Sequence, residues 1–412
     1  MEEKKVWDWH TPLKEIPVKE WESRFNWVEE HSISNDGESI ASIVNLGEMA
    51  FGICVDGKLW DKEYEKAWSL KPVSHSGFAA CVCQDEEWTL TVNGQEWSNR
   101  FDFLWDMQLG HLGSRIGMAC QRDGEYGMVV DDQPWDLGFE SISGMVMGSQ
   151  GQSAAIVQAE SMKAADVDAF AKGLFSVAVN GQAREERFLN IWDLAFDKAG
   201  DNLTCAIRLN REQYSIALNG IPWEERFQAV WRPMFLNQSK SVVAPVRYMG
   251  KWRLFKDNQQ FWTSGYENIW RLIQSHGRVA AVVAPAFGQW TVAEDDRLWP
   301  VTWDTMVRDI YYSRDGSSLV AVFKDQGSWG LAKDARAWTL SCDKIFTPVI
   351  SHDGSVVAVS FEKQGAYFVS VNDKVITGPH TAMADPVISP DGEKILIKGI
   401  EDGVYQRRII EI

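Results

Sequence analysis

Hydrophobic and polar positions follow one another along this chain in short segments that recur about every 38 residues. The apolar runs, such as those at 320–323 and 357–360, are short, rich in β-branched residues and bounded by polar turns. Short apolar runs between turns favour strands over helices. The pattern therefore predicts an all-β chain built from a repeated unit.

Each repeat carries a turn dipeptide that begins with Asp or Asn. The nine turns are Asp56-Gly57, Asn93-Gly94, Asp131-Asp132, Asn180-Gly181, Asn219-Gly220, Asp257-Asn258, Asp295-Asp296, Asp334-Ala335 and Asn372-Asp373. An aromatic residue precedes each turn by five positions: Phe51, Trp88, Tyr126, Phe175, Tyr214, Trp252, Trp290, Trp329 and Tyr367. A tryptophan usually follows the turn by four or five positions: Trp60, Trp97, Trp135, Trp223, Trp262, Trp299 and Trp338. Self-similarity at this period is typical of propellers and solenoids.

A second landmark is a polar hairpin tip, of the kind Ser389-Pro390-Asp391-Gly392, that precedes an apolar run and occurs ten times. The tip and the turn divide one repeat into four strands. In the fifth repeat we expect these strands at about 189–195, 202–208, 213–218 and 221–227. Four short antiparallel strands at this period make one propeller blade. The segment 223–231 also has aromatics at helical spacing, so a helical turn is the alternative there to a strand followed by a loop.

The two ends of the chain complement each other. Tyr405 is the tenth aromatic of the series, and the chain stops at Ile412, where a tenth outer strand should begin. The segment Trp21–Phe25 has the outer-strand pattern of 97–101 and 223–227, so the N-terminal segment should supply the missing strand. Such closure removes free sheet edges. We therefore predict a single domain over 1–412, a β-propeller of about ten short four-stranded blades closed by its terminal strands; two five-bladed propellers are the alternative.

Two segments depart from the repeat. An insertion at 158–173 is rich in Ala, Met and Lys, which suggests a short helix, and Met162 and Phe170 would lie on its apolar stripe. In an N-terminal tail, 1–17, Trp7 and Trp9 are out of register with the repeat. They either tuck onto the edge of the propeller or anchor a partner, because tryptophan is enriched at interface hot spots. Trp7, Trp9, Met162 and Phe170 are thus the candidate partner-binding residues.

The chain has 21 tryptophans, and 19 of them lie at recurring positions. A carbohydrate surface and an electron-hopping path are functional readings of this number. A residue that recurs in nearly every unit, however, serves the unit rather than one site. We therefore expect the tryptophans to pack the blades, each contributing roughly 2–3 kcal/mol by buried area.

Charge and motifs exclude several function classes. The net charge of −17 disfavours nucleic acid and anionic lipid as partners. The first ten residues lack an apolar core and no segment has 18 uninterrupted apolar residues, so we expect neither a secretory signal nor a membrane span. The six cysteines form no C-x-x-C pair, and no zinc, calcium, phosphate-loop or nucleophile-elbow motif occurs. The repeated Glu-Glu-Arg-Phe segments lie on predicted outer strands. We therefore expect no cofactor, no metal and no catalytic residue.

The tips Ser313-Arg314-Asp315-Gly316, Ser351-His352-Asp353-Gly354 and Ser389-Pro390-Asp391-Gly392, each followed by an apolar strand, resemble blades of WD-repeat and TolB-type propellers. The Gly-His and Trp-Asp dipeptides of the standard WD unit are not kept in place. The size, acidity and tryptophan content, with Trp7, Trp9, Trp21 and Trp27 at the start, resemble TmcD, the tryptophan-rich subunits of the Tmc transmembrane redox complexes of sulfate-reducing bacteria. That resemblance implies an iron–sulfur protein and a membrane cytochrome b as partners, a multihaem cytochrome as an indirect one, and no cofactor or catalytic residue of its own.

The expected function is that of a non-catalytic scaffold in a membrane-associated electron-transfer complex, in the cytoplasm or peripheral to the inner face of the cytoplasmic membrane. The alternative is a propeller enzyme or carbohydrate-binding module that uses the central cavity. Exposed aromatics or clustered carboxylates at the cavity would favour the alternative. An exposed apolar rim near 158–173 or the tail would favour the scaffold.

Overall fold

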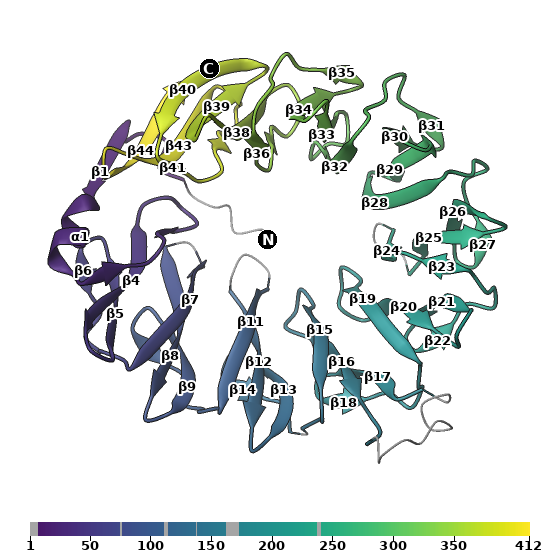
Figure 1. Ribbon diagram of the computed structural model, residues 1–412, viewed down its shortest axis with the longest axis horizontal. Helices are drawn as coiled ribbons and strands as arrows, with labels where there is room; N and C mark the ends of the chain where they lie inside the picture. Colours follow the sequence, from purple (N-terminus) through teal and green to yellow (C-terminus); the bar gives the residue numbers. More distant parts are fainter. Residues whose placement is uncertain (1–6, 75, 111–113, 137, 162–172, 237–239) are drawn as a thin grey trace. The chain divides into compact units, whose positions relative to one another are not determined.

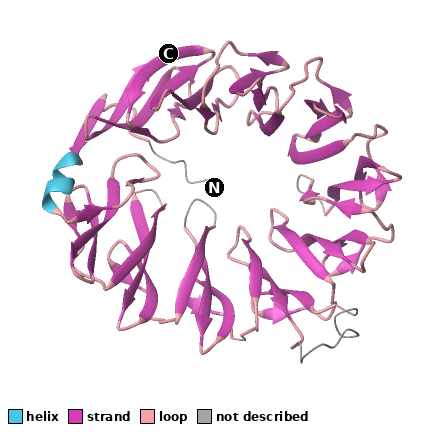
Figure 2. Ribbon diagram, viewed as in Figure 1, coloured by secondary structure: helices cyan, strands magenta, loops and turns pink. Residues whose placement is uncertain are grey.

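The computed structural model describes residues 7–412 except 75, 111–113, 137, 162–172 and 237–239. Its described residues form ten small antiparallel sheets, each with four successive strand positions, and one short helix (Figures 1 and 2). The prediction of an all-β propeller with ten blades is therefore confirmed. The blades are numbered 1 to 10 in chain order. The chain falls into two compact units, Met1–Glu63 with Tyr266–Ile412, and Tyr64–Gly265.

The first unit contains blades 1 and 7 to 10. Blade 1 comprises β2 (Trp27–Val28), β3 (Ser32–Ile33), β4 (Ile40–Gly47), β5 (Ala50–Val55) and β6 (Lys58–Leu59). Blade 7 comprises β28 (Asn268–Ser275), β29 (Arg278–Ala286), β30 (Gln289–Glu294) and β31 (Arg297–Leu298), and blade 8 comprises β32 (Met306–Tyr312), β33 (Leu319–Asp325), β34 (Ser328–Lys333) and β35 (Arg336–Ala337). Blade 9 comprises β36 (Lys344–Ile345), β37 (Val349–Ile350), β38 (Val357–Lys363), β39 (Ala366–Val371) and β40 (Lys374–His380). Blade 10 comprises β41 (Ala382–Met383), β42 (Val387–Ile388), β43 (Lys394–Glu401), β44 (Val404–Glu411) and, from the start of the chain, β1 (Leu13–Pro17).

The second unit contains blades 2 to 6. Blade 2 comprises β7 (Lys66–Val73), β8 (Gly77–Gln84), β9 (Glu87–Val92) and β10 (Gln95–Glu96), and blade 3 comprises β11 (Phe103–Leu109), β12 (Ile116–Arg122), β13 (Glu125–Val130) and β14 (Gln133–Pro134). Blade 4 comprises β15 (Ile142–Met147), β16 (Ser153–Gln158), β17 (Phe175–Val179) and β18 (Gln182–Ala183), and blade 5 comprises β19 (Asn190–Phe196), β20 (Leu203–Arg208), β21 (Tyr214–Leu218) and β22 (Ile221–Pro222). Blade 6 comprises β23 (Ala229–Val230), β24 (Met234–Phe235), β25 (Val242–Tyr248), β26 (Lys251–Lys256) and β27 (Gln259–Gln260).

The Asp or Asn that opens each repeated turn has two structural tasks. All nine have positive φ between 46° and 52°, a region that Asn and Asp tolerate better than other side chains. In blade 5, the Asn219 side-chain oxygen also accepts a hydrogen bond of 2.9 Å from the Leu203 amide at the start of the second strand. The same bond occurs in blades 1 to 9, which explains why only these two residue types fill the position.

The Ser-x-Asp-Gly tips form a second repeated device. In blade 8 the Ser313 hydroxyl donates to Asp315 Oδ1 at 2.7 Å and accepts from the Ser318 amide at 2.9 Å. Gly316 follows with φ 74°, where glycine carries no steric cost. Blades 1, 9 and 10 repeat these contacts. Each tip therefore fixes the hairpin between the first and second strands.

The core lies along the second strands and between neighbouring blades. The second strand β33 is buried over five consecutive residues because both of its faces are covered, so its sequence is continuously apolar rather than alternating. The tryptophans that follow the turns pack against these interblade clusters: Trp97 between blades 2 and 3, Trp223 between 5 and 6, Trp299 between 7 and 8, and Trp338 between 8 and 9. Packing is therefore their role.

The terminal closure is confirmed, but by a different segment from the one predicted. Strand β1 pairs antiparallel with β44, from Leu13 opposite Arg408 to Pro17 opposite Val404. The segment around Trp21, predicted as the outer strand, is instead the helix α1 (Lys19–Arg24). The Trp21 pattern matches the loop that follows each fourth strand, because the fourth strand itself lies earlier in the repeat.

The fifth repeat shows the same offset. Its strands β19, β20 and β21 agree with the prediction to within a residue at each end, but the outer strand β22 has two residues rather than seven. Trp223 follows β22, and the loop rejoins the blade at a single bridge between Phe227 and Tyr214. A strand plus a loop therefore describes 221–231 better than a helical turn. Residues 162–172, most of the predicted helical insertion, lie outside the described residues.

Candidate functional site

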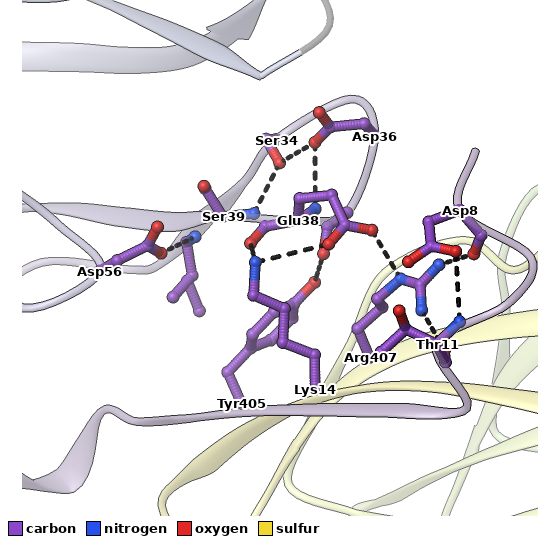
Figure 3. Close-up of polar contacts among 12 residues, drawn as sticks. Asp8, Thr11, Lys14, Ser34, Asp36, Glu38, Ser39, Asp56, Tyr405 and Arg407 are labelled. Carbon is purple, nitrogen blue, oxygen red and sulfur yellow. Dashed lines mark hydrogen bonds and ion pairs between the residues drawn. The ribbon is translucent and has the colours of Figure 1, made fainter. Parts of the chain in front are cut away.

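A buried arginine organises the seam where the tail, blade 1 and blade 10 meet (Figure 3). Arg407 on β44 is 0% exposed. Its Nε lies 2.8 Å from Glu38 Oε1, and its terminal nitrogens donate to the backbone carbonyls of Asp8 and Thr11, the latter at 2.6 Å. A buried arginine requires such partners because burial of an unpaired charge is costly. This cluster fastens the tail onto the propeller.

Further polar contacts extend the seam. The Lys14 ammonium donates to the Glu38 carbonyl at 2.6 Å, and the Tyr405 hydroxyl donates to the Gly37 carbonyl at 2.5 Å (Figure 3). Burial and the nearby charge of Glu38 raise the pKa of Tyr405, so its phenol remains protonated. The Thr11 side chain and the backbone amides of His10 and Thr11 hold the pKa of Asp8 at about 2. The seam is therefore a set of ion-paired and hydrogen-bonded groups that joins the two ends of the chain.

A polar cavity lies between blades 9 and 10. Its volume is about 380 Å³, and its lining residues are Ile376, Thr377, Gly378, His380, Glu401, Arg408 and Ile410. Arg408 Nη2 donates to Thr377 Oγ1 at 2.9 Å, and the same hydroxyl lies 3.2 Å from His380 Nε2. His380 Nδ1 is 3.9 Å from Glu401 Oε2, beyond hydrogen-bonding distance. The cavity thus brings one cation, one carboxylate, a hydroxyl and an imidazole together.

Three of these lining residues differ in type from the residues at the same positions of the other blades. His380 pairs with Tyr367 across blade 9, and the equivalent bridges in six other blades use Phe101, Phe139, Phe188, Phe227, Trp303 and Cys342. Ile376 follows its turn by four residues, the position of Trp97, Trp135, Trp223, Trp299 and Trp338 elsewhere. Arg408 stands three residues after the repeated aromatic, where the other blades have Cys, Thr, Val, Ala, Phe or Ser. Ile376 and His380 are therefore smaller than the indole and the phenyl ring at these positions of several other blades, and Arg408 adds a charge beside the cavity.

The protonation of His380 follows from its surroundings. Burial lowers its pKa, the charge of Glu401 raises it and that of Arg408 lowers it further, with burial the largest cause. These contacts are compatible with a neutral imidazole. Its Nδ1 carries the proton and lies toward Glu401, and its Nε2 accepts a hydrogen bond from the Thr377 hydroxyl. Neither His380 Nδ1 nor Arg408 Nε has a hydrogen-bond partner, although both atoms are buried. Two buried N–H groups are thus left unsatisfied beside the cavity.

No sequence motif marks this site, and its signal lies at the position thirteen residues after each repeated aromatic. At that position His380 would have stood out against Tyr64, Phe101 and Phe188. The informative signal was a departure from the repeat rather than a motif.

The structure places two of the four candidate partner-binding residues. Trp7 and Trp9 are half-buried, and the Lys398 ammonium lies 5.2 Å from the centroid of the Trp7 ring. Trp7 therefore packs on blade 10 beside the seam, and its role toward a partner remains a prediction. Met162 and Phe170 lie outside the described residues.

Aromatic side chains also gather on the first strands of the blades. In blades 2 and 3, Phe103 stacks between Trp68 and Trp105, with ring centroids 5.7 and 6.0 Å apart. In blade 6, Trp231 stacks on Trp252 at 5.3 Å. Phe103 and Trp231 nevertheless leave more than a third of their surface exposed. These rings therefore pack both within a blade and between neighbouring blades, and some of them are partly exposed.

Metal or thiol chemistry has little support among the described residues. They contain no group of three or more His, Cys, Asp or Glu side chains placed to hold a metal ion. All six cysteines are buried and free, and burial raises the pKa of each thiol for which a shift is evident, to about 12 for Cys81 and Cys205. Such thiols are poor nucleophiles at neutral pH. Within the same described portion, no helix is long and apolar enough to cross a membrane.

Comparison with known proteins shows structural likeness only. No protein-family model matches the chain, and no curated protein matches it. A solved structure titled "Crystal structure of the eukaryotic initiation factor" is similar with a TM-score of 0.45 and 10% identity, over 85% of this chain and 89% of the other. "Structure of Dos1 propeller" is similar with a TM-score of 0.37 and 9% identity, over 92% of this chain and 90% of the other. Likenesses this distant do not bear on what the present chain binds.

Proposed function

We propose that this chain is a non-catalytic scaffold that binds partner proteins through exposed apolar residues at the turns between the second and third strands of its blades. The observation that supports it best is Phe287, which is 99% exposed at the turn between β29 and β30. Met49 and Met249 occupy the equivalent turns of blades 1 and 6 and are also exposed. Polar or glycine residues are the usual choice for such turns. Aromatic and methionine side chains on exposed turns are instead typical of interface residues.

The finer proposal is that the partners belong to a membrane-associated electron-transfer complex of the Tmc kind. It rests on the resemblance in size, acidity and tryptophan content, and on the assignment of the conspicuous aromatics to packing. Such a scaffold would lie in the cytoplasm or on the inner face of the membrane. An iron–sulfur subunit and a membrane cytochrome b are then the expected partners.

A pull-down from solubilised native membranes tests this proposal. Recovery of an iron–sulfur subunit together with cytochrome b, identified by mass spectrometry and haem absorbance, is the supporting result. The variant Phe287→Ser should reduce that recovery, whereas Leu298→Ser should not. Leu298 is a matched control because it is 46% exposed on the outer strand of the same blade. If the tagged chain recovers neither subunit, the proposal of redox partners is rejected. If both variants recover the subunits as the wild type does, the proposal that Phe287 contacts the partner is rejected.

A carbohydrate-binding module is the second candidate, and the partly exposed stack of Trp68, Phe103 and Trp105 favours it. Aromatic faces offer the apolar platforms that small-molecule sites commonly use. A glycan array with the wild-type chain and with Phe103→Ala separates the two candidates. Binding that the substitution abolishes would support the module, and an array without any bound glycan would reject it.

A further inference from the structure

We propose that the cavity between blades 9 and 10 binds a small zwitterion, an α-amino acid with an aliphatic side chain. The inference does not depend on the scaffold role. Its starting point is the local loss of the repeat, where Ile376, His380 and Arg408 replace larger or less polar residues and all line one cavity of about 380 Å³. This volume lies at the lower end of the range for small-molecule sites, which is about 300–1,000 Å³.

The loss of apolar packing there has a cost that closure of the propeller does not require. His380 is only 5% exposed, yet its Nδ1 and the nearby Arg408 Nε are buried without a hydrogen-bond partner. A buried polar group without a hydrogen-bond partner destabilises the folded state. At the position of His380, seven other blades have Phe, Trp, Tyr or Cys, none of which buries an imidazole. A ligand that uses these polar groups gives a physical reason for retaining them.

The charges of the cavity define the class of ligand. Arg408 is the only lining residue with a permanent positive charge, and its guanidinium is suited to a carboxylate. Glu401 supplies a negative charge and is 41% exposed, so it can meet an ammonium group from solvent. A simple anion would be repelled by Glu401, and a simple cation by Arg408. A ligand that carries both charges complements the pair.

The apolar part of the cavity defines the ligand's side chain. Ile376 and Ile410 line the cavity and also pack against the buried cluster of Val369, Ile395 and Ile397. An aliphatic side chain would extend this cluster and bury additional apolar surface, which favours binding. The Thr377 hydroxyl, already bonded to Arg408, holds the guanidinium in place. We therefore take L-leucine as the probe.

Calorimetric titration of the full chain tests the proposal with three probes: L-leucine, 4-methylpentanoate, which lacks the ammonium, and 3-methylbutylamine, which lacks the carboxylate. Leucine should bind with a dissociation constant in the millimolar range or lower. The dissociation constant of each analogue should be at least about tenfold higher, a difference of about 1.4 kcal/mol. Absence of heat with all three probes would overturn the proposal. Equal binding of leucine and either analogue would also overturn it, because the site would then recognise a single charge.

Variants link binding to the cavity. Arg408→Gln and Glu401→Gln should each weaken leucine binding about tenfold or more, and Ile376→Trp should abolish it by restoring the indole that fills this position elsewhere. Arg336→Gln, at an exposed position on the outer strand of blade 8, is the control and should bind as the wild type does. Near-ultraviolet circular dichroism confirms the fold of each variant. Leucine binding that survives both Glu401→Gln and Ile376→Trp would place the site elsewhere and reject the proposal.

Discussion

Replacement of Arg407 by Met should release the closing strand β1 from blade 10. The substitution keeps much of the side-chain volume but removes the ion pair to Glu38 and the hydrogen bonds to the carbonyls of Asp8 and Thr11. Removal of one partner from a buried ion pair costs about 3–5 kcal/mol. Glu38 retains 29% exposure and can be rehydrated, so we take the lower end, about 3 kcal/mol.

This energy applies to local opening of the tail, which hydrogen exchange measures directly. A loss of about 3 kcal/mol predicts that amides of β1, such as those of Lys14 and Ile16, exchange about a hundredfold faster in Arg407→Met. Amides of β12, in the other compact unit, should be unchanged. Exchange should be followed by mass spectrometry of peptides from both strands.

A double-mutant cycle then isolates the pair. Glu38→Gln alone should accelerate exchange in β1, and the double variant should add much less than the sum of the two single effects, because the two side chains contact each other. Arg336→Met serves as the control for loss of an exposed arginine. If Arg407→Met changes β1 exchange less than about threefold, the seam is not held by this residue and the reasoning is refuted.

Three further outcomes are expected. Asn219→Ala should lower stability by about 1–2 kcal/mol in urea unfolding, because it removes the acceptor for the Leu203 amide and strains a turn at positive φ; an unchanged midpoint would contradict the role given to the repeated turn residue. The stability of His380→Phe relative to the wild type should rise as the pH falls below 6.5. Burial lowers the pKa of His380 in the folded state, so the wild type has this contribution to stability in full above pH 6.5 and loses it below that pH. Parallel pH profiles of the thermal midpoint would argue against a buried neutral imidazole. Hydrogen bonds, first from the Thr11 side chain, lower the pKa of Asp8, so the ionised carboxylate stabilises the tail above about pH 4 and this contribution is lost as the pH falls through about 2. Asp8→Asn should remove the contribution. The thermal midpoints of the two proteins, measured between pH 2 and 6, should therefore converge at the acid end, and a constant difference would contradict this assignment.

The repeat determined the blades because each of its signals has a local cause. Asn219 and its equivalents are required by a turn at positive φ whose side chain accepts one amide. Ser313 and Asp315 fix their tip through contacts within a few residues. Such short-range requirements are visible in a single sequence, so four strands per repeat and ten blades could be predicted from it.

The end of the chain shows where local reasoning failed. The Trp21 pattern correctly marked the end of a repeat, but it marked the segment after the fourth strand, here the helix α1, and not the strand itself. β1 itself, Leu13–Pro17, carries no tryptophan, and its place depends on pairing with β44 nearly 400 residues away. A partner so distant in sequence leaves no local signal in the strand that it pairs with.

The sequence by itself determined the number of blades, their strand pattern and the packing role of most tryptophans, since these follow from turn chemistry and from burial that repeats in every unit. Only the tertiary structure decided that Arg407 joins the tail to Glu38, and that Ile376, His380, Glu401 and Arg408 line one cavity. The cavity residues come from three strands of two blades, β40, β43 and β44, and have no common spacing. Their chemistry arises from the packing of one blade against the next, which no single repeat contains.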